Sequence, residues 1–278
     1  MTYYLKKSEW MNSIIIPEGM NVDMLNMEGR LDLILKPGLD AECPGKTVID
    51  MGCGTGVLGI YAMSKGAEFV YFVEQDDQMV YILENILPNK VDPNKYKIIH
   101  KDIEDLILRD FDQLPPDVAV SEFYGPRLFD EGYVNYTKHI KKLFPECRFI
   151  PDKFLGTFYF VDIDYSQPIW PGDVELIDYF KFMYKEKGFA RYIDLPDKRQ
   201  IVGKVEYDAN TGVFRNNLDI TYPHQEDKLL VGVMSATYRT YVHNYTTIGW
   251  LFGADEYNKS FKIYFDEENY FNPNKVKL

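Results

Sequence analysis

The hydrophobic and polar positions of this chain follow one rhythm up to about residue 150 and a different one after it. In the first part, short β-branched or aromatic runs alternate with stretches of helical character. That alternation is typical of a mostly parallel sheet, because a crossover helix separates consecutive parallel strands. The pattern predicts strands at residues 47–51, 69–74, 96–100 and 117–121.

Three helices are expected between and after these strands. Residues 57–65 form the first, and a glycine directly after them stops it. The second runs to residue 87 with Asp76 or Asp77 as its cap, and a proline then ends it. Residues 128–143 have helical spacing, and Phe149-Ile150-Pro151 marks a boundary. We therefore expect a Rossmann-like domain over residues 1–150.

Beyond residue 152 the strand–helix rhythm is lost. Strand-like runs follow one another at residues 155–164, 200–207, 214–221, 229–240 and 260–265. Such a succession predicts an antiparallel sheet or barrel rather than βαβ units. Residues 173–187 interrupt it as a helical insertion, capped by Asp173. The predicted fold is α/β: a Rossmann-like doubly wound sheet, then a β-rich, barrel-like domain over residues 151–278.

The amino-acid composition limits the kinds of binding partner to expect. The net charge is −12 and no run of Lys or Arg stands out, so a nucleic-acid partner is not expected, whereas a basic peptide would be attracted. The cysteines at positions 43, 53 and 147 lack the spacing of a zinc site or a disulfide framework, and no metal is expected. No segment has the length and hydrophobicity of a membrane span, so we expect a soluble cytoplasmic protein.

The turn between the first strand and the first helix carries the strongest chemical signal. Asp50 ends the strand, and glycines follow at positions 52, 54 and 56. Glycine has no Cβ and tolerates positive φ, so a ligand can approach the bare backbone of such a turn. An acid here would repel a pyrophosphate, which disfavours a dinucleotide. Glu74 ends the next strand, 22 residues after Gly52, where a doubly wound fold places its ribose-binding carboxylate.

The segment Asp50-Met51-Gly52-Cys53-Gly54-Thr55-Gly56 resembles the cofactor loop of class I methyltransferases, which reads Asp/Glu-x-Gly-x-Gly-x-Gly. The resemblance implies S-adenosyl-L-methionine as the cofactor. It also implies that the cofactor contacts include Asp50, Gly52, Gly54, Gly56 and Glu74.

Two glutamates follow the fourth predicted strand. Glu122 comes directly after it, at the carboxyl edge where open α/β sheets bind ligands, and Glu131 lies nine residues later. Gly125 and Pro126 allow the loop to fold back, so the two acids can face each other. A pair of carboxylates in that arrangement suits a planar guanidinium, which offers paired hydrogen bonds.

Residues 121–131 resemble the double-glutamate loop of protein arginine methyltransferases, and both acids stand at that family's spacing. The resemblance implies that Glu122 and Glu131 are the catalytic residues. Residues 24–30 resemble the family helix whose arginine, here Arg30, holds the cofactor carboxylate. Residues 98–106 resemble its adenine-contacting segment, and there the candidates are Asp102, Ile103 and Glu104.

Several positions depart from that family. Phe123-Tyr124 replace its Trp-Met. Its paired Asp and His are both missing: Met27 stands at the Asp position, and Thr246 to Trp250, the counterpart of its Thr-His-Trp loop, has no His. A small-molecule or nucleic-acid methyltransferase and a non-catalytic cofactor-binding protein therefore stay open as alternatives.

Association is the last expectation from the family likeness. Family members often close a ring with an arm from the barrel, and residues 173–187 sit at a comparable place. The resemblance thus implies a homodimer. The alternative is a helix that packs its apolar face on its own barrel.

Overall fold

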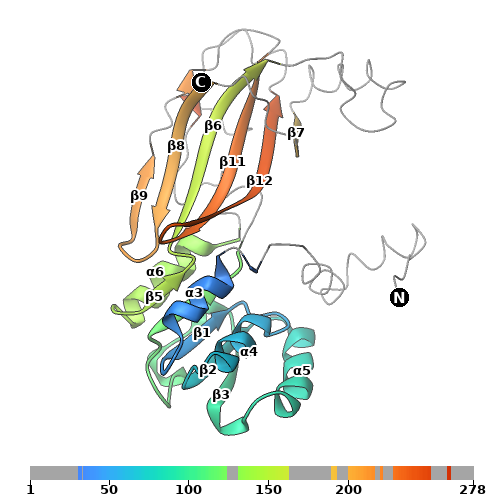
Figure 1. The fold of residues 1–278 in the computed structure, drawn as a ribbon, viewed down its shortest axis with the longest axis vertical. Helices are drawn as coiled ribbons and strands as arrows, with labels where there is room; N and C mark the ends of the chain where they lie inside the picture. Colours follow the sequence, from blue (N-terminus) through green and yellow to red (C-terminus); the bar gives the residue numbers. More distant parts are fainter. Residues whose placement is uncertain are drawn as a thin grey trace, which may run out of the picture. The chain divides into compact units, whose positions relative to one another are not determined.

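The computed structural model describes residues 31–32, 34–123, 131–162, 189–192, 200–216, 220–221, 228–251 and 262–263. The chain forms two compact units, drawn as a ribbon in Figure 1. The first unit comprises Met1–Glu122, Asn135–Asp152 and Tyr238–Val242. The second comprises Phe123–Val134, Lys153–Thr237 and His243–Leu278. The division of the chain at residue 150 stays a prediction.

A five-stranded parallel sheet forms the centre of the first unit. Its strands are β1 (Thr47–Met51), β2 (Phe69–Glu74), β3 (Tyr96–His100), β4 (Val118–Ser121) and β5 (Arg148–Ile150). Their order in the sheet is β3-β2-β1-β4-β5, and every neighbouring pair is parallel. The doubly wound prediction is confirmed. The fourth strand begins one residue later than predicted, and the expected boundary at residues 149–151 includes a fifth strand.

The helices in the described part of the first unit are α3 (Leu35–Glu42), α4 (Val57–Ser64), α5 (Asp77–Ile86) and most of α6 (Tyr133–Leu143). Asp76 caps α5, because its carboxylate accepts hydrogen bonds from the backbone N–H groups of Gln78 and Met79. The helix predicted at residues 128–143 ends where α6 ends, but its predicted start was too early. Gly132 has a φ of 81°, which is not helical, and α6 begins after it.

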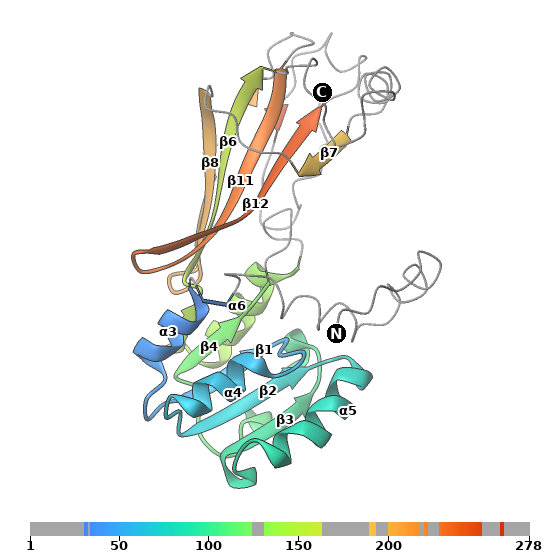
Figure 2. The ribbon, with the colours of Figure 1, turned by 45° about the vertical axis from the view of Figure 1, so that its right-hand side comes forward.

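The two faces of the first sheet are covered by different elements. Phe72 points to the face that α4 covers, and Figure 2 shows α4 along β1 and β2 with α5 beside β3. Tyr71 points to the other face, where its ring meets Phe111 at 4.9 Å between centroids. Phe111 in turn meets Phe144, the residue after α6. Because β2 is buried on both faces, all six of its residues are buried.

The second unit is antiparallel, as expected. Six strands, in the order β7-β12-β11-β6-β8-β9, form one sheet. They are β6 (Lys153–Asp162), β7 (Phe189–Tyr192), β8 (Gln200–Asp208), β9 (Val213–Asn216), β11 (Lys228–Tyr238) and β12 (Tyr241–Leu251). β10 (Ile220–Thr221) and β13 (Lys262–Ile263) form a separate antiparallel pair. The core of the second unit contains an aromatic cluster, in which Tyr133 packs on Phe154 and Tyr207.

The strand predictions for the second unit were incomplete: β7 was not predicted, and the run predicted at residues 214–221 holds two separate strands, β9 and β10. The run at residues 229–240 ends early, because β11 turns at Arg239 and Thr240 into β12, which was not predicted. Arg239 adopts a φ of 53° although it is not a glycine, so the usual turn signal is missing. Thr246 to Trp250, which we matched to a loop, lies within β12, and its Ile248 pairs with Tyr192 of β7.

Three predicted features lie outside the described residues: Arg30 with its helix, the loop from residue 124 to 130, and the helical insertion at 173–187. Among the residues with a described placement, no helix is long and apolar enough to cross a membrane.

Candidate functional site

The predicted cofactor residues that the structure describes gather at the carboxyl edge of the parallel sheet. Strand β1 lies between β2 and β4, so the chain order reverses between β1 and β4. The register pairs Met51 with Val73 on one side and with Ser121 on the other. Gly52, Glu74 and Glu122, which follow these three residues, therefore stand side by side at the switch point. Ligands of open α/β sheets bind at such a point.

The glycine turn has the backbone that its sequence predicts. Gly52, Gly54 and Gly56 have φ values of 62°, 50° and 73°. Gly56 is the N-cap of α4, and its N–H donates to the carbonyl of Cys53 at 2.7 Å. The N–H of Cys53 donates to the carbonyl of Val73 at 2.9 Å. The turn is thus fastened to β2 as well as to its own helix.

Glu74 holds the turn through its carboxylate. The side chain is nearly buried at 8% exposure, and its Oε2 accepts from the N–H of Gly54 at 2.8 Å. Its Oε1 accepts from the N–H groups of Gln75 at 2.8 Å and Asp76 at 3.0 Å. A carboxylate oriented by backbone donors keeps a fixed direction, and its remaining lone pairs can accept from a ligand hydroxyl.

Asp50 supports the turn from beneath. It is 1% exposed, and its Oδ2 accepts from the N–H of Gly59 in α4 at 2.8 Å. Burial raises the pKa of Asp50 to about 8; the hydrogen bond from Gly59 opposes that shift and the charge of Glu74 adds to it. A positively charged ligand nearby would favour the ionised form of this carboxyl group.

The adenine-contacting candidates occupy a short 3-10 turn, η3 (Ile103–Asp105), directly after β3. Asp102 caps this turn, with its Oδ1 accepting from the N–H of Glu104 at 2.8 Å. Ile103 is buried at 5% exposure, whereas the side chain of Glu104 is exposed. The sequence left Asp102 and Glu104 equivalent; the structure gives Asp102 a local capping role. Glu104 is the acid left facing solvent.

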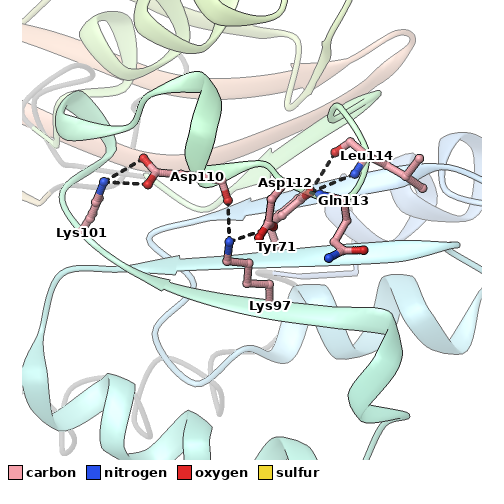
Figure 3. A network of polar contacts seen from close by, with 7 residues as sticks. All are labelled: Tyr71, Lys97, Lys101, Asp110, Asp112, Gln113 and Leu114. Carbon is pink, nitrogen blue, oxygen red and sulfur yellow. Dashed lines mark hydrogen bonds and ion pairs between the residues drawn. The ribbon is translucent and has the colours of Figure 1, made fainter.

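A polar network holds the segment that follows these acids (Figure 3). The hydroxyl of Tyr71 accepts from the N–H groups of Gln113 and Leu114, at 3.2 and 3.1 Å, and donates to the carbonyl of Leu114 at 3.0 Å. Lys97 donates to the carbonyl of Asp110 at 2.9 Å and to the carboxylate of Asp112 at 2.8 Å. The connection from β3 to β4 is therefore fixed to the sheet.

The two predicted catalytic acids lie in different units. Glu122 is half-buried directly after β4, and Glu131 is exposed shortly before α6. Between them, residues 124–130 lie outside the described part, so their guanidinium clamp stays a prediction. Ser121, the last residue of β4, is fully buried, and its Oγ has no hydrogen-bond partner in the described part of the chain. Sequence patterns gave no sign of this hydroxyl.

The donor set fits an S-adenosylmethionine-type cofactor. Two buried or nearly buried carboxylates, Asp50 and Glu74, flank the bare backbone of the turn, which suits ribose hydroxyls and positive charge rather than phosphate. Within the described ranges, no group of three or more His, Cys, Asp or Glu side chains is arranged to hold a metal ion.

Sheet order, glycine turn and acidic carboxyl edge together define a protein with a Rossmann-like methyltransferase fold and a second, antiparallel unit. A protein-family model described as "Conserved hypothetical protein 95" matches residues 37–118. A probable protein arginine N-methyltransferase 6.1 of Oryza sativa subsp. indica is 32% identical over 111 residues, which are 40% of this chain and 25% of that protein.

A second sequence relative and two solved structures are also similar to this chain. The histone-arginine methyltransferase CARMER of Aedes aegypti is 33% identical over 109 residues, 39% of this chain and 18% of that protein. The matched part is thus a quarter or less of these relatives. A crystal structure of PRMT6 has a TM-score of 0.60 at 14% identity and covers 84% of this chain and 89% of its own.

An open-conformation structure of Arabidopsis thaliana protein arginine methyltransferase 10 has a TM-score of 0.58 at 17% identity, with 84% of this chain and 82% of that chain covered. At these identities the structures show a shared fold. The sequence relatives match about two fifths of this chain.

Proposed function

We propose that the chain is an S-adenosylmethionine-dependent methyltransferase. The glycine turn at the switch point carries this proposal, because Glu74 and Asp50 fix its backbone without any contribution from a ligand. Gly52 exposes its backbone at the carboxyl edge, whereas Gly54 is buried and donates its N–H to Glu74. Glu74 accepts ribose hydroxyls, and Glu104 is the acid for the adenine amino group. Arg30 holds the cofactor carboxylate. The two sequence relatives described above are named as arginine methyltransferases, which supports this proposal.

We further propose that the substrate is the guanidinium of an arginine in a protein. Glu122 follows β4 at the carboxyl edge and Glu131 stands nine residues later, which is the spacing of the double-glutamate loop described above. The acidic chain, with a net charge of −12, attracts basic peptides.

The proposed chemistry is an in-line transfer. When bound, the cofactor supplies an activated methyl group on a sulfonium. Glu122 and Glu131 each accept hydrogen bonds from the guanidinium, which holds its attacking nitrogen in line with that methyl group. The two carboxylates also draw positive charge toward the far nitrogens, so the attacking nitrogen becomes more electron-rich. As the new carbon–nitrogen bond forms, the methyl–sulfur bond would break with its electron pair left on a neutral thioether, and the guanidinium would release one proton to water.

Methyl transfer to arginine–glycine peptides, followed by mass spectrometry, tests this function. A matched peptide with lysine in place of arginine is the control substrate. We expect methylation of the arginine peptide alone. Calorimetry in the absence of peptide tests the cofactor separately: Glu74→Ala is expected to weaken binding about 10–150-fold, since a charged hydrogen bond contributes about 1.5–3 kcal/mol. Unchanged affinity in Glu74→Ala contradicts the cofactor assignment.

The clamp itself is tested by Glu122→Gln and Glu131→Gln, which keep size but remove charge. Each is expected to lower methyl transfer about 100-fold, as for the loss of a preorganised electrostatic contact, with cofactor affinity unchanged. The double variant is expected to lose little more than either single one, because both acids act on one group. Glu68→Gln, at an exposed position, is the matched control. Full activity in either variant rejects the guanidinium clamp.

A non-catalytic cofactor-binding protein is the second candidate. Met27 and the His-free stretch within β12 favour it, because both members of the family's Asp/His pair are missing. A wild-type protein that binds the cofactor but methylates no arginine peptide supports this candidate or a methyltransferase for small molecules. Assays with amines and other small nucleophiles separate those two.

A further inference from the structure

Lys101 connects two parts of the proposed cofactor site that are far apart in the chain. It directly follows β3, and its side chain donates to both carboxylate oxygens of Asp110, at 2.7 and 2.8 Å. Figure 3 shows this bidentate pair beside the Lys97 and Tyr71 contacts. Asp110 Oδ2 also accepts from the N–H of Ile107 at 2.9 Å. The pair therefore closes the segment between residues 101 and 110 into a loop.

The backbone of Lys101 makes the second connection. Its N–H donates to the carbonyl of Glu74 at 2.9 Å. The carboxylate of Glu74 in turn binds the N–H of Gly54 at 2.8 Å. Hydrogen bonds thus run without a break from the glycine turn through Glu74 and Lys101 to Asp110.

The Lys101–Asp110 pair is shielded enough to hold one geometry. The side chain of Asp110 is 14% exposed and that of Lys101 is 34% exposed. Burial alone would raise the pKa of Asp110, but the hydrogen bonds from Lys101 and Ile107 and the charges of Lys101 and Arg109 outweigh it, so the net shift is downward. A bidentate, charge-assisted contact fixes direction better than a single hydrogen bond.

The loop that this pair closes contains the proposed adenine wall. This wall consists of Ile103, Glu104 and Leu106. Ile103 and Leu106 are buried, and Glu104 is exposed on the same short turn. The carbonyl of Leu106 lies 2.8 Å from His139 Nε2 in α6, so the far side of the loop is also held. If the Asp110 contact is lost, the backbone bond to Glu74 and the His139 contact stay, but the wall loses its link to the Lys101 side chain and is held less firmly relative to Glu74.

We propose that Lys101 is a positioning residue for the nucleoside end of the cofactor, which sets the adenine wall at a fixed distance from Glu74. This role rests on the proposed cofactor. Lys101 itself touches neither the adenine nor the reacting atoms. It acts through Asp110 on the segment that carries Ile103 and Glu104.

Three variants at this position test the role. Lys101→Met keeps the length of the side chain and the backbone bond but removes the ion pair. We expect the dissociation constant for S-adenosylhomocysteine, measured by calorimetry, to rise about tenfold, and that for free adenosine to rise by the same factor. Lys101→Arg keeps the bidentate contact and is expected to restore affinity. Asp110→Asn combined with Lys101→Met is expected to weaken binding no further than the lysine variant alone.

Lys46→Met is the matched control. Lys46 pairs with Asp117 at 3.4 Å before β1 and β4, at the opposite edge of the same sheet. Its loss is expected to leave both dissociation constants unchanged. With saturating cofactor, Lys101→Met is expected to keep kcat while KM for the cofactor rises. A variant that is merely less well folded would instead lower the apparent kcat, because a smaller fraction of the protein would be active. Amide exchange at Ile107 is expected to accelerate in Lys101→Met without any ligand.

Two outcomes overturn the proposal in different ways. If the wild-type protein binds S-adenosylhomocysteine and Lys101→Met binds it equally tightly, the positioning role is wrong and the cofactor assignment stands. If the wild-type protein binds neither S-adenosylhomocysteine nor adenosine, the cofactor assignment fails and the role fails with it.

Discussion

Replacing Gly59 by alanine tests how tightly α4 packs on the sheet beneath the cofactor turn. A Cβ at this position would lie 2.3 Å from Cε1, 2.7 Å from Cζ and 3.0 Å from Cδ1 of Phe72. An unstrained carbon–carbon contact is about 3.5–4.0 Å long. The ring of Phe72 is fully buried and also meets Tyr96 edge-on at 6.0 Å between centroids, so a shift of the ring would disturb a packed neighbour.

Two opposing free-energy terms set the stability change in Gly59→Ala. Alanine is favoured over glycine inside a helix by about 1 kcal/mol. Overpacking of a filled core costs about 1–3 kcal/mol, and the shortness of the 2.3 Å approach places Gly59→Ala toward the upper end. We therefore expect a net loss of about 1–2 kcal/mol in the free energy of unfolding, measured by urea denaturation followed by circular dichroism.

The displacement of α4 in Gly59→Ala should also affect the cofactor turn. The N–H of Gly59 donates to Asp50, so moving α4 outward weakens that bond, and cofactor affinity is expected to fall together with stability. Phe72→Leu removes part of the ring, and the double variant is expected to be more stable than the sum of the single changes predicts. Ser64→Ala, at an exposed position of α4, is the control. Wild-type stability in Gly59→Ala, or strictly additive changes, refutes the close-packing argument.

Three further predictions concern the pH dependence, a buried hydroxyl and association. Because the pKa of Asp50 is raised from 3.8 to about 8, unfolding releases a proton between about pH 4 and 8, and the stability of the ligand-free protein should fall as pH rises through that window. Asp50→Asn should flatten this slope; an unchanged slope in denaturant titrations contradicts the assignment. Ser121→Ala should leave the free energy of unfolding unchanged or raise it, because the Oγ forms no hydrogen bond with the described residues, whereas a loss of 1 kcal/mol or more would show that the hydroxyl is satisfied. The helix predicted at residues 173–187 should make the protein a homodimer, and a monomeric mass by light scattering at micromolar concentration would leave that helix as core packing.

Most elements of the first unit could be predicted because their signals are local. β-branched runs, capping acids and glycine stops lie within a few residues of the structure that they specify. β1, β2 and β3 begin and end where the pattern places them, and Asp76 caps α5. Where the local signal is missing, prediction failed. No glycine or asparagine marks the turn at Arg239, so the strand predicted for β11 ran into this turn and β12 was not predicted.

The candidate site was predictable in its residue types but not in its connections. The positive φ values of Gly52, Gly54 and Gly56 follow from the spacing of the glycines alone. The role of Asp102 as a cap does not, because a surface acid and a capping acid look alike in a sequence until the backbone that follows them is known.

By itself, the sequence determined the strand–turn–helix unit around Asp50 and the acids that end β2 and follow β4. These features depend on the conformational preferences of neighbouring residues. Only the tertiary structure decided the strand order β3-β2-β1-β4-β5 and the contact of Lys101 with both Glu74 and Asp110. Such contacts join residues that are far apart in the chain. They form when buried faces pack together, and the periodicity of a single segment carries no information about which partner it meets.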